Sequence, residues 1–154
     1  MPLSQLILPQ IKKTTPKTAK KLESALYREL KQAAKKEKRK LVLTRLETWA
    51  TAGVPDLLIC DDRGLLHMVE LKFSSGNVVR LSPHQVSWLT QHKHSSSWVL
   101  VKKQSKKDLK PYIFLYKADS AISLSQNGLK TKPFYTSQYP LDWNVIFRLL
   151  LSLT

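Results

Sequence analysis

Two acidic residues and a lysine stand at the ends of two apolar segments within residues 53–72 (GVPDLLICDDRGLLHMVELK). Asp56 opens the first segment, and Glu70 and Lys72 close the second. Charged groups are rarely placed among apolar strands without a partner, a bound metal or a catalytic task. Asp56 and Glu70, with the backbone carbonyl of Leu71, offer the oxygen ligands that Mg²⁺ prefers, and such a metal assists phosphodiester hydrolysis. Lys72 is placed to hold the attacking water and to stabilise charge that grows on phosphorus.

The turn between the two segments decides whether these side chains can meet. The sequence DDRG is a turn signal between apolar runs. A three-residue loop at 62–64, with Gly64 in the left-handed region, starts the strand pairing at Asp61 and places Asp56 opposite Glu70 on one face. A four-residue loop would put the two acids on opposite faces, because one residue of slip reverses a strand. The metal chemistry favours the three-residue loop.

The charge of the chain indicates its kind of partner. There are 26 Lys and Arg against 11 Asp and Glu, a net charge of +15. This excess favours a polyanion, and nucleic acid fits better than a membrane because no basic amphipathic helix with Trp or Phe on its apolar face stands out. Basic residues cluster in 11–40 and 102–110, whereas 56–70 holds four acids and one arginine. A basic body around an acidic spot suits a bound cation with phosphates held on its basic flanks.

Length and cysteine content set the class of protein. A chain of 154 residues suits a single domain with a real core. No apolar run reaches the roughly 18 residues that a membrane span requires. The single cysteine, Cys60, excludes a disulfide framework and a Cys-rich zinc site, and its apolar surroundings are typical of a small core residue. An intracellular setting follows.

A long helix is expected from Thr15-Pro16 to about Arg39, because threonine is a good N-cap and proline suits the first helical position. Its apolar stripe at helical spacing comprises Leu22, Leu26, Leu30 and Ala33. Glu23 and Glu29 each lie about 60° from the centre of this stripe, on opposite sides. Periodicity therefore does not choose which of them, if either, faces a site.

The remaining elements follow from capping and apolar patterns. Ser82, Pro83 and Gln85 form a capping box that opens a second helix, and this explains Gln85 without any role at a site. Strands are expected at 40–44, 97–102 and 111–117, the last of them edge-like at its proline, whereas 118–139 is expected to be irregular. A final helix is expected over 141–151, with a buried side formed by Trp143, Ile146, Phe147 and Leu150.

The motifs together resemble those of the PD-(D/E)XK nuclease superfamily. Pro55-Asp56 corresponds to the PD element, and Glu70-Leu71-Lys72 to the ExK element. Four motifs follow in the order of the VRR-NUC group and its Holliday-junction-resolvase-like relatives: Glu23-Ser24-Ala25, Gly53-Val54-Pro55-Asp56, Glu70-Leu71-Lys72 and Leu81-Ser82-Pro83-His84-Gln85. The resemblance covers about residues 20–103, and its specificity lies in the combination, since either short element alone arises often by chance.

The resemblance implies an α/β fold with a restriction-endonuclease-like αβββαβ core, in which helices flank a central mixed sheet. Residues 1–15 are expected to be an N-terminal arm, and 16–154 a single nuclease domain. Its core would occupy about 20–103, and a C-terminal extension with a further strand and helix would occupy 104–154.

The resemblance also implies roles for individual residues. Asp56 and Glu70, with the Leu71 carbonyl, would bind Mg²⁺, for which Mn²⁺ would substitute, and Lys72 would be the catalytic lysine. The resemblance selects Glu23 over Glu29 as the first-helix acid, either a metal ligand through water or a residue that positions water. It gives Gln85 a supporting role. The basic residues expected to contact DNA are Lys20, Lys21, Arg80, Lys102 and Lys103.

The expected function is that of a metal-dependent endodeoxyribonuclease with structure or site specificity, in the cytoplasm of a bacterium or a virus-infected cell. Cutting two strands usually takes two sites, which favours a homodimer. The alternative is a basic nucleic-acid-binding protein that keeps the nuclease fold without cleaving. A structural protein with a basic surface is a further alternative, and it would bind DNA weakly with little dependence on salt.

Overall fold

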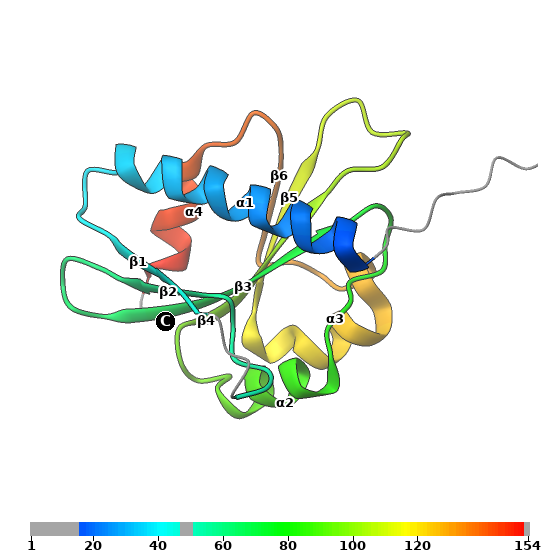
Figure 1. Ribbon diagram of the computed structural model, residues 1–154, viewed down its shortest axis with the longest axis horizontal. Coiled ribbons are helices and arrows are strands. Elements are labelled where there is room, and N and C mark those ends of the chain that lie inside the picture. The colour runs from blue at the N-terminus through cyan, green and yellow to red at the C-terminus, as the bar shows by residue number, and fades with distance from the viewer. Residues whose placement is uncertain (1–15, 47–50, 153–154) are drawn as a thin grey trace, which may run out of the picture.

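The computed structural model describes residues 16–46 and 51–152, which form an α/β fold with a six-stranded mixed sheet (Figure 1). The elements in chain order are α1 (Pro16–Lys36), β1 (Val42–Arg45), β2 (Leu57–Cys60), β3 (Leu66–Ser74), α2 (Pro83–Gln91), β4 (Ser97–Lys103), β5 (Tyr112–Lys117), the 3₁₀ turn η1 (Ala118–Ser120), α3 (Ala121–Asn127), the 3₁₀ turn η2 (Gly128–Lys130), β6 (Tyr135–Gln138) and α4 (Trp143–Leu150). No helix in this part of the chain is long and apolar enough to cross a bilayer.

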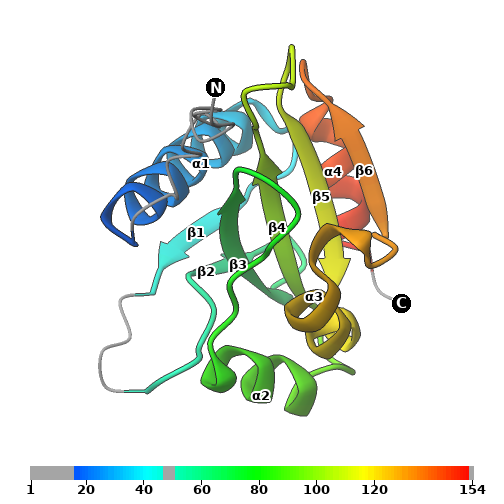
Figure 2. The same cartoon turned by 90° about the vertical axis from the view of Figure 1, so that its right-hand side faces the viewer.

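The strands lie in the sheet in their chain order, β1 to β6 (Figure 2). Neighbouring strands are antiparallel except β3 and β4, which are parallel. A parallel pair needs a crossover connection, and α2 supplies it. The predicted order of helix, three strands, helix and strand is therefore confirmed up to Lys103.

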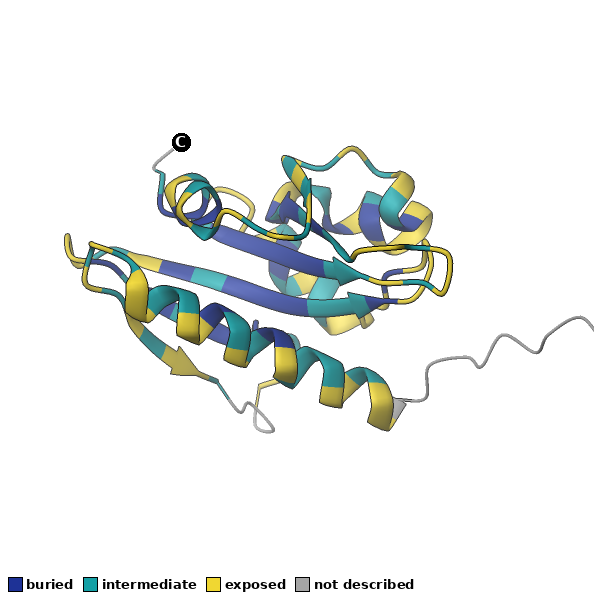
Figure 3. Ribbon diagram, turned by 90° about the horizontal axis from the view of Figure 1, so that it is seen from above, coloured by how far each residue is buried: buried dark blue, intermediate teal, exposed yellow. Residues whose placement is uncertain are grey.

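Helices cover both faces of the sheet. Leu26 and Leu30 of α1 share one apolar core with Ile146 and Phe147 of α4, on one face of the sheet. A second core on the opposite face joins residues of α2 and α3 to the central strands. Because it is covered on both sides, β4 is buried at five successive residues, and Figure 3 shows the central strands dark along much of their length.

The register of the β2–β3 hairpin is the one predicted. Leu57 pairs with Val69, and the backbone N–H of Asp61 donates to the carbonyl of Leu65 at 2.9 Å. Gly64 has a φ of 80°, a left-handed conformation that glycine adopts without steric cost. The three-residue loop at 62–64 is thus confirmed.

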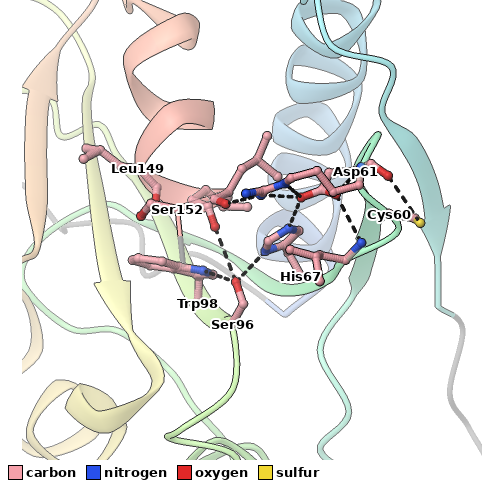
Figure 4. Close-up of polar contacts among 11 residues, drawn as sticks. Cys60, Asp61, His67, Ser96, Trp98, Leu149 and Ser152 are labelled. Carbon is pink, nitrogen blue, oxygen red and sulfur yellow. Dashed lines mark hydrogen bonds and ion pairs between the residues drawn. The ribbon is translucent and has the colours of Figure 1, made fainter. Parts of the chain in front are cut away.

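A buried polar cluster fastens this turn to distant parts of the chain (Figure 4). His67, which is fully buried, contacts Asp61 Oδ2 through Nε2 at 2.9 Å and Ser96 Oγ through Nδ1 at 2.5 Å. Arg63 Nη2 donates to Asp61 Oδ2 at 2.6 Å and to the carbonyl of Leu151 at 2.7 Å. The hydrogen bonds that Arg63 donates to the Asp61 carboxylate are the main reason why the pKa of Asp61 lies well below its usual value.

The aspartate, histidine and serine of this cluster lie in the order of a hydrolase triad, but the serine is fully engaged by the fold. Ser96 Oγ also accepts a hydrogen bond from Trp98 Nε1 at 3.1 Å and contacts the carbonyl of Leu150 at 3.4 Å. We therefore interpret the cluster as structural.

Several expectations for individual segments were wrong. Residues 118–139 were expected to be irregular, but they contain α3 and β6. Both elements are short, so their periodic patterns in the sequence are weak. The strand after Pro111 is not at an edge, since β5 pairs with β4 and β6 and begins at Tyr112, so the proline lies outside the ladder.

Cys60 is half-buried rather than a core residue, because Leu57 and Ile59 take the covered face of β2. The expected arm, 1–15, with the cap at its end, lies outside the described residues.

The two helices α1 and α2 otherwise follow their predicted patterns. The stripe of α1 is buried at Leu26 and Leu30, whereas Ala33 packs at the margin of the core. On α2, Ser82 Oγ accepts from the N–H of Gln85, and Gln85 Oε1 accepts from the N–H of Ser82, which completes the predicted capping box.

Candidate active site

The hairpin brings Asp56 and Glu70 together. Continuing the pairing of Leu57 with Val69 by one residue sets Asp56 opposite Glu70, at the mouth of the β2–β3 ladder. The backbone N–H of Leu71 donates to Asp56 Oδ2 at 3.1 Å, so the carboxylate is held against β3. The geometric condition for a shared metal site, that the two acids do not point apart, is met.

Glu70 has an unusual environment for a carboxylate. It is 1% exposed. Its Oε1 accepts from Gln85 Nε2 at 2.7 Å and lies 3.2 Å from Lys72 Nζ. Its Oε2 is buried and has no hydrogen-bond partner among the described residues. A buried polar atom without a partner is costly, and it marks the place where a proton or a cation would bind.

The electrostatics of the cluster favour a positive ligand. Burial raises the pKa of Glu70 to about 8, and the charge of Asp56 adds to this more than the charge of Lys72 offsets it. Burial also raises the pKa of Asp56, against the hydrogen bond from Leu71 and the charge of Lys72. Three acids with raised pKa values lie together once Glu23 is included, since burial raises its pKa too.

Helix α1 contributes Glu23 and not Glu29. The pKa of Glu23 responds to the charges of Lys72 and Asp56, so Glu23 lies within electrostatic reach of both. Glu29 instead accepts a hydrogen bond from Lys102 Nζ at 3.2 Å. The structure thus decides between the two glutamates, which periodicity left open.

Gln85 has two tasks at the start of α2. Its Oε1 completes the helix cap, while its Nε2 donates to Glu70. Gly53 allows this approach: its φ is 89°, and a Cβ at this position would overlap the backbone carbonyl of His84. The loop that leads to Asp56 therefore packs directly on the first turn of α2.

Sequence reasoning missed one basic residue beside the cluster, Arg45 at the end of β1. Its charge lowers the pKa of Asp56, its Nη2 donates to Ser24 Oγ at 3.0 Å, and its guanidinium lies 5.1 Å from the centre of the Tyr27 ring. Arg45 ends the strand paired with β2, and Asp56 precedes β2, so antiparallel pairing alone could have revealed their proximity.

The five basic residues expected to contact DNA fall into two groups. Lys20, Lys21 and Arg80 are exposed. Lys102 is paired with Glu29, and its Nζ lies 4.6 Å from the centre of the Tyr139 ring. Lys103 is half-buried and lies 3.8 Å from Asp108. The first group is available to phosphates as it stands, and the second is engaged within the chain.

The oxygen atoms of the cluster fit a hard divalent cation. Within the described ranges, no group of three or more His, Cys, Asp and Glu side chains is arranged to hold a metal. Asp56 and Glu70 supply two carboxylates, to which the carbonyl of Leu71 is the expected third oxygen. The unpartnered Oε2 of Glu70 is the observation that favours this fit. Mg²⁺ takes few protein ligands and keeps several waters, so such a small donor set suits it.

The raised pKa of Glu70 predicts how stability changes with pH in the absence of metal. Between pH 4.5, the usual pKa of a glutamate, and about pH 8, the raised pKa of Glu70, the folded protein keeps a proton on Glu70. The unfolded chain releases that proton in the same range. The free energy of unfolding should therefore fall as the pH rises through this window, by up to about 1.4 kcal/mol per pH unit for one group. Urea unfolding in EDTA at pH 5 to 8 measures this.

Glu70→Gln should remove most of that slope, because glutamine has no proton to lose. Glu37→Gln, just beyond the far end of α1 and outside the cluster, is the matched control and should leave the slope unchanged. Equal slopes in wild type and Glu70→Gln would show that Glu70 is ionised at neutral pH.

The chain matches no protein-family model, and a search of curated proteins finds no similar sequence. The case for a function therefore depends on the cluster itself. Its acids, lysine and glutamine come from α1, β3, α2 and the residue before β2. Together they can bind a divalent cation and offer an ammonium group beside it.

Proposed function

We propose that this protein is a metal-dependent endodeoxyribonuclease of the PD-(D/E)XK type, which hydrolyses DNA phosphodiester bonds. The observation that carries the proposal is the buried carboxylate of Glu70, with one oxygen unpartnered, Asp56 opposite and Lys72 in contact. A cation bound to such a carboxylate would offset the free-energy cost of burying its charge. The burial of Glu70 therefore favours binding of the metal that the reaction needs.

Each residue of the cluster has a role in this reaction. Asp56 and Glu70, with the Leu71 carbonyl, would hold Mg²⁺ or Mn²⁺; when bound, such a metal polarises the scissile phosphate and lowers the pKa of a water ligand. Lys72 would orient the attacking water and stabilise the developing negative charge. Gln85 fixes the position of Glu70. Glu23, on the α1 side, would either bind the metal through a water or position the attacking water.

Fold and charge agree with this proposal. The order α1-β1-β2-β3-α2-β4 is that expected of a restriction-endonuclease-like core, to which β5, β6, α3 and α4 would be the extension. The net charge of +15 and the exposed Lys20, Lys21 and Arg80 favour DNA as the partner. A homodimer, with one site for each strand, would cut duplex DNA.

A metal-titrated cleavage panel tests the proposal. Labelled duplex, nicked, flap, junction and single-stranded DNA would be incubated with Mg²⁺ or Mn²⁺. Asp56→Asn removes one ligand charge and should lower the cleavage rate by at least about 100-fold on every substrate that the wild type cuts. Asp62→Asn, in the exposed turn of the same hairpin, is the matched control and should cleave at the wild-type rate.

Two outcomes would contradict the proposal. Equal rates for wild type and Asp56→Asn would place the activity elsewhere. Tight, salt-dependent binding of DNA without cleavage in any metal would favour the alternative, a binding protein on a nuclease fold.

A further inference from the structure

The loop between β4 and β5 carries the most exposed large apolar side chain of the described residues. Leu109 is 99% exposed, against 69% for Val78, the next in order. Its neighbours Lys106, Lys107 and Lys110 are exposed as well and form no ion pair within the described part of the chain. Figure 1 shows the loop, in yellow-green, extending beyond the sheet.

This loop is held in shape by its one acidic residue. Asp108 Oδ2 accepts from the N–H of Ser105 at 2.8 Å and from its hydroxyl at 2.9 Å, and it lies 3.8 Å from Lys103 Nζ. The hydrogen bonds from Ser105 lower the pKa of Asp108, so the carboxylate stays charged. A loop fixed in this way loses little conformational entropy when it binds a partner.

The loop leaves the sheet at the same end as the acidic cluster. Ser74, the last residue of β3, pairs with Lys103 of β4, and the N–H of Gln104 donates to the Ser74 carbonyl at 3.0 Å. Lys72 lies beside Val101 in the same register. Two strand residues and half of the loop then separate Lys72 from the tip by at most about 20 Å, at about 3.3 Å per extended residue.

We propose that residues 104–111, the Leu109 loop, bind DNA on one side of the scissile phosphate and insert Leu109 between two base pairs. This inference rests on the proposed function for its partner and for the position of the cut. Lys106, Lys107 and Lys110 contact phosphates, while Leu109 leaves water for the apolar faces of a base step. Apolar side chains act as such wedges in proteins that kink DNA, and flexible or branched steps unstack at least cost.

The separation from Lys72 sets where the wedge acts. With base pairs about 3.4 Å apart, a separation of at most about 20 Å places the wedge within about six steps of the cleaved bond. The same wedge gives the protein a reason to prefer DNA that is already unstacked, such as a branch point, without any contact to base edges.

The test uses DNA with 2-aminopurine at successive positions, in EDTA, so that no cleavage is needed. The wild type should raise the fluorescence several-fold at one step. Leu109→Ser should abolish the rise while changing the affinity less than about tenfold. Leu66→Ser removes a 58% exposed leucine at the start of β3 and should behave as the wild type. Lys106→Gln combined with Lys107→Gln should lower the slope of log affinity against log salt by about two.

The outcomes separate this inference from the proposed function. An unchanged fluorescence rise in Leu109→Ser, or no rise in a wild type that binds DNA, overturns the wedge even if the protein cleaves. Loss of the rise in Leu109→Ser supports the wedge even if no metal restores cleavage. If the wild type binds phosphatidylserine vesicles at 150 mM salt and Leu109→Ser does not, with no effect on DNA, the loop is a membrane contact and the inference is wrong.

Discussion

Replacing Lys72 by alanine is expected to lower the rate of DNA cleavage by about 10²–10³-fold at saturating Mg²⁺, the loss typical of one preorganised donor to a developing oxyanion. Lys72 Nζ lies 3.2 Å from Glu70 Oε1, and its side chain is 11% exposed. It is therefore positioned by the protein and only partly screened by water. Single-turnover cleavage of a labelled substrate measures the effect on chemistry, separately from the affinity for DNA.

The same substitution also changes the charge at the metal site, because Lys72 lowers the pKa of Glu70. The rates must therefore be compared at the plateau of a metal titration. Lys117→Ala is the control: it removes another half-buried lysine of the sheet, whose Nζ lies 4.5 Å from the centre of the Phe134 ring. A cleavage rate for Lys72→Ala within tenfold of the wild-type rate would show that Lys72 has no direct role in the chemical step.

Replacing Asp61 by alanine should lower the free energy of unfolding by about 3 kcal/mol at pH 7. His67 is fully buried, and it would lose the acceptor for Nε2. Removing one partner of a buried charge pair typically lowers the free energy of unfolding by about 3–5 kcal/mol. We expect a loss at the lower end of this range, because Arg63, the other partner of Asp61, is half-exposed and water can solvate its charge. Urea unfolding measures the change, with Asp62→Ala, in the exposed turn, expected within about 0.5 kcal/mol of the wild type.

The contribution of Asp61 to the free energy of unfolding changes with pH in the opposite direction to the contribution of Glu70. The pKa of Asp61 is lowered from its usual 3.8 in the folded protein, so its contribution is complete above that value and is lost as the pH falls below it. The difference between wild type and Asp61→Ala should be constant from pH 5 to 8 and shrink below pH 4. Equal stabilities at pH 7 would show that the polar cluster contributes nothing net.

Local signals made the hairpin and the second helix predictable. The turn signal at 61–64 predicted the hairpin but left loops of three and four residues open. The metal chemistry favoured the three-residue loop, and strand alternation then placed Asp56 opposite Glu70. The box of Ser82 and Gln85 likewise set the start of α2. Both depend on residues close in sequence, where turn and cap chemistry act directly.

Contacts between distant segments were beyond such reasoning. No sequence signal near Asp61 predicts that Ser96 or the carbonyl of Leu151 belongs to its cluster. The second task of Gln85, its contact with Glu70, was implied only by the family resemblance, because the cap alone already explained the residue. The segment holding β6 was missed because its four residues are stabilised by pairing with β5 rather than by a strong pattern of their own.

The hydrogen bond between Arg63 and Leu151 joins residues 88 positions apart, and that between Ser96 and Leu150 joins residues 54 apart. Loop closure over such distances must precede the gain from these contacts, which slows folding. The β2–β3 turn can form early, yet its buried histidine and aspartate gain their full set of partners only when α4 has docked.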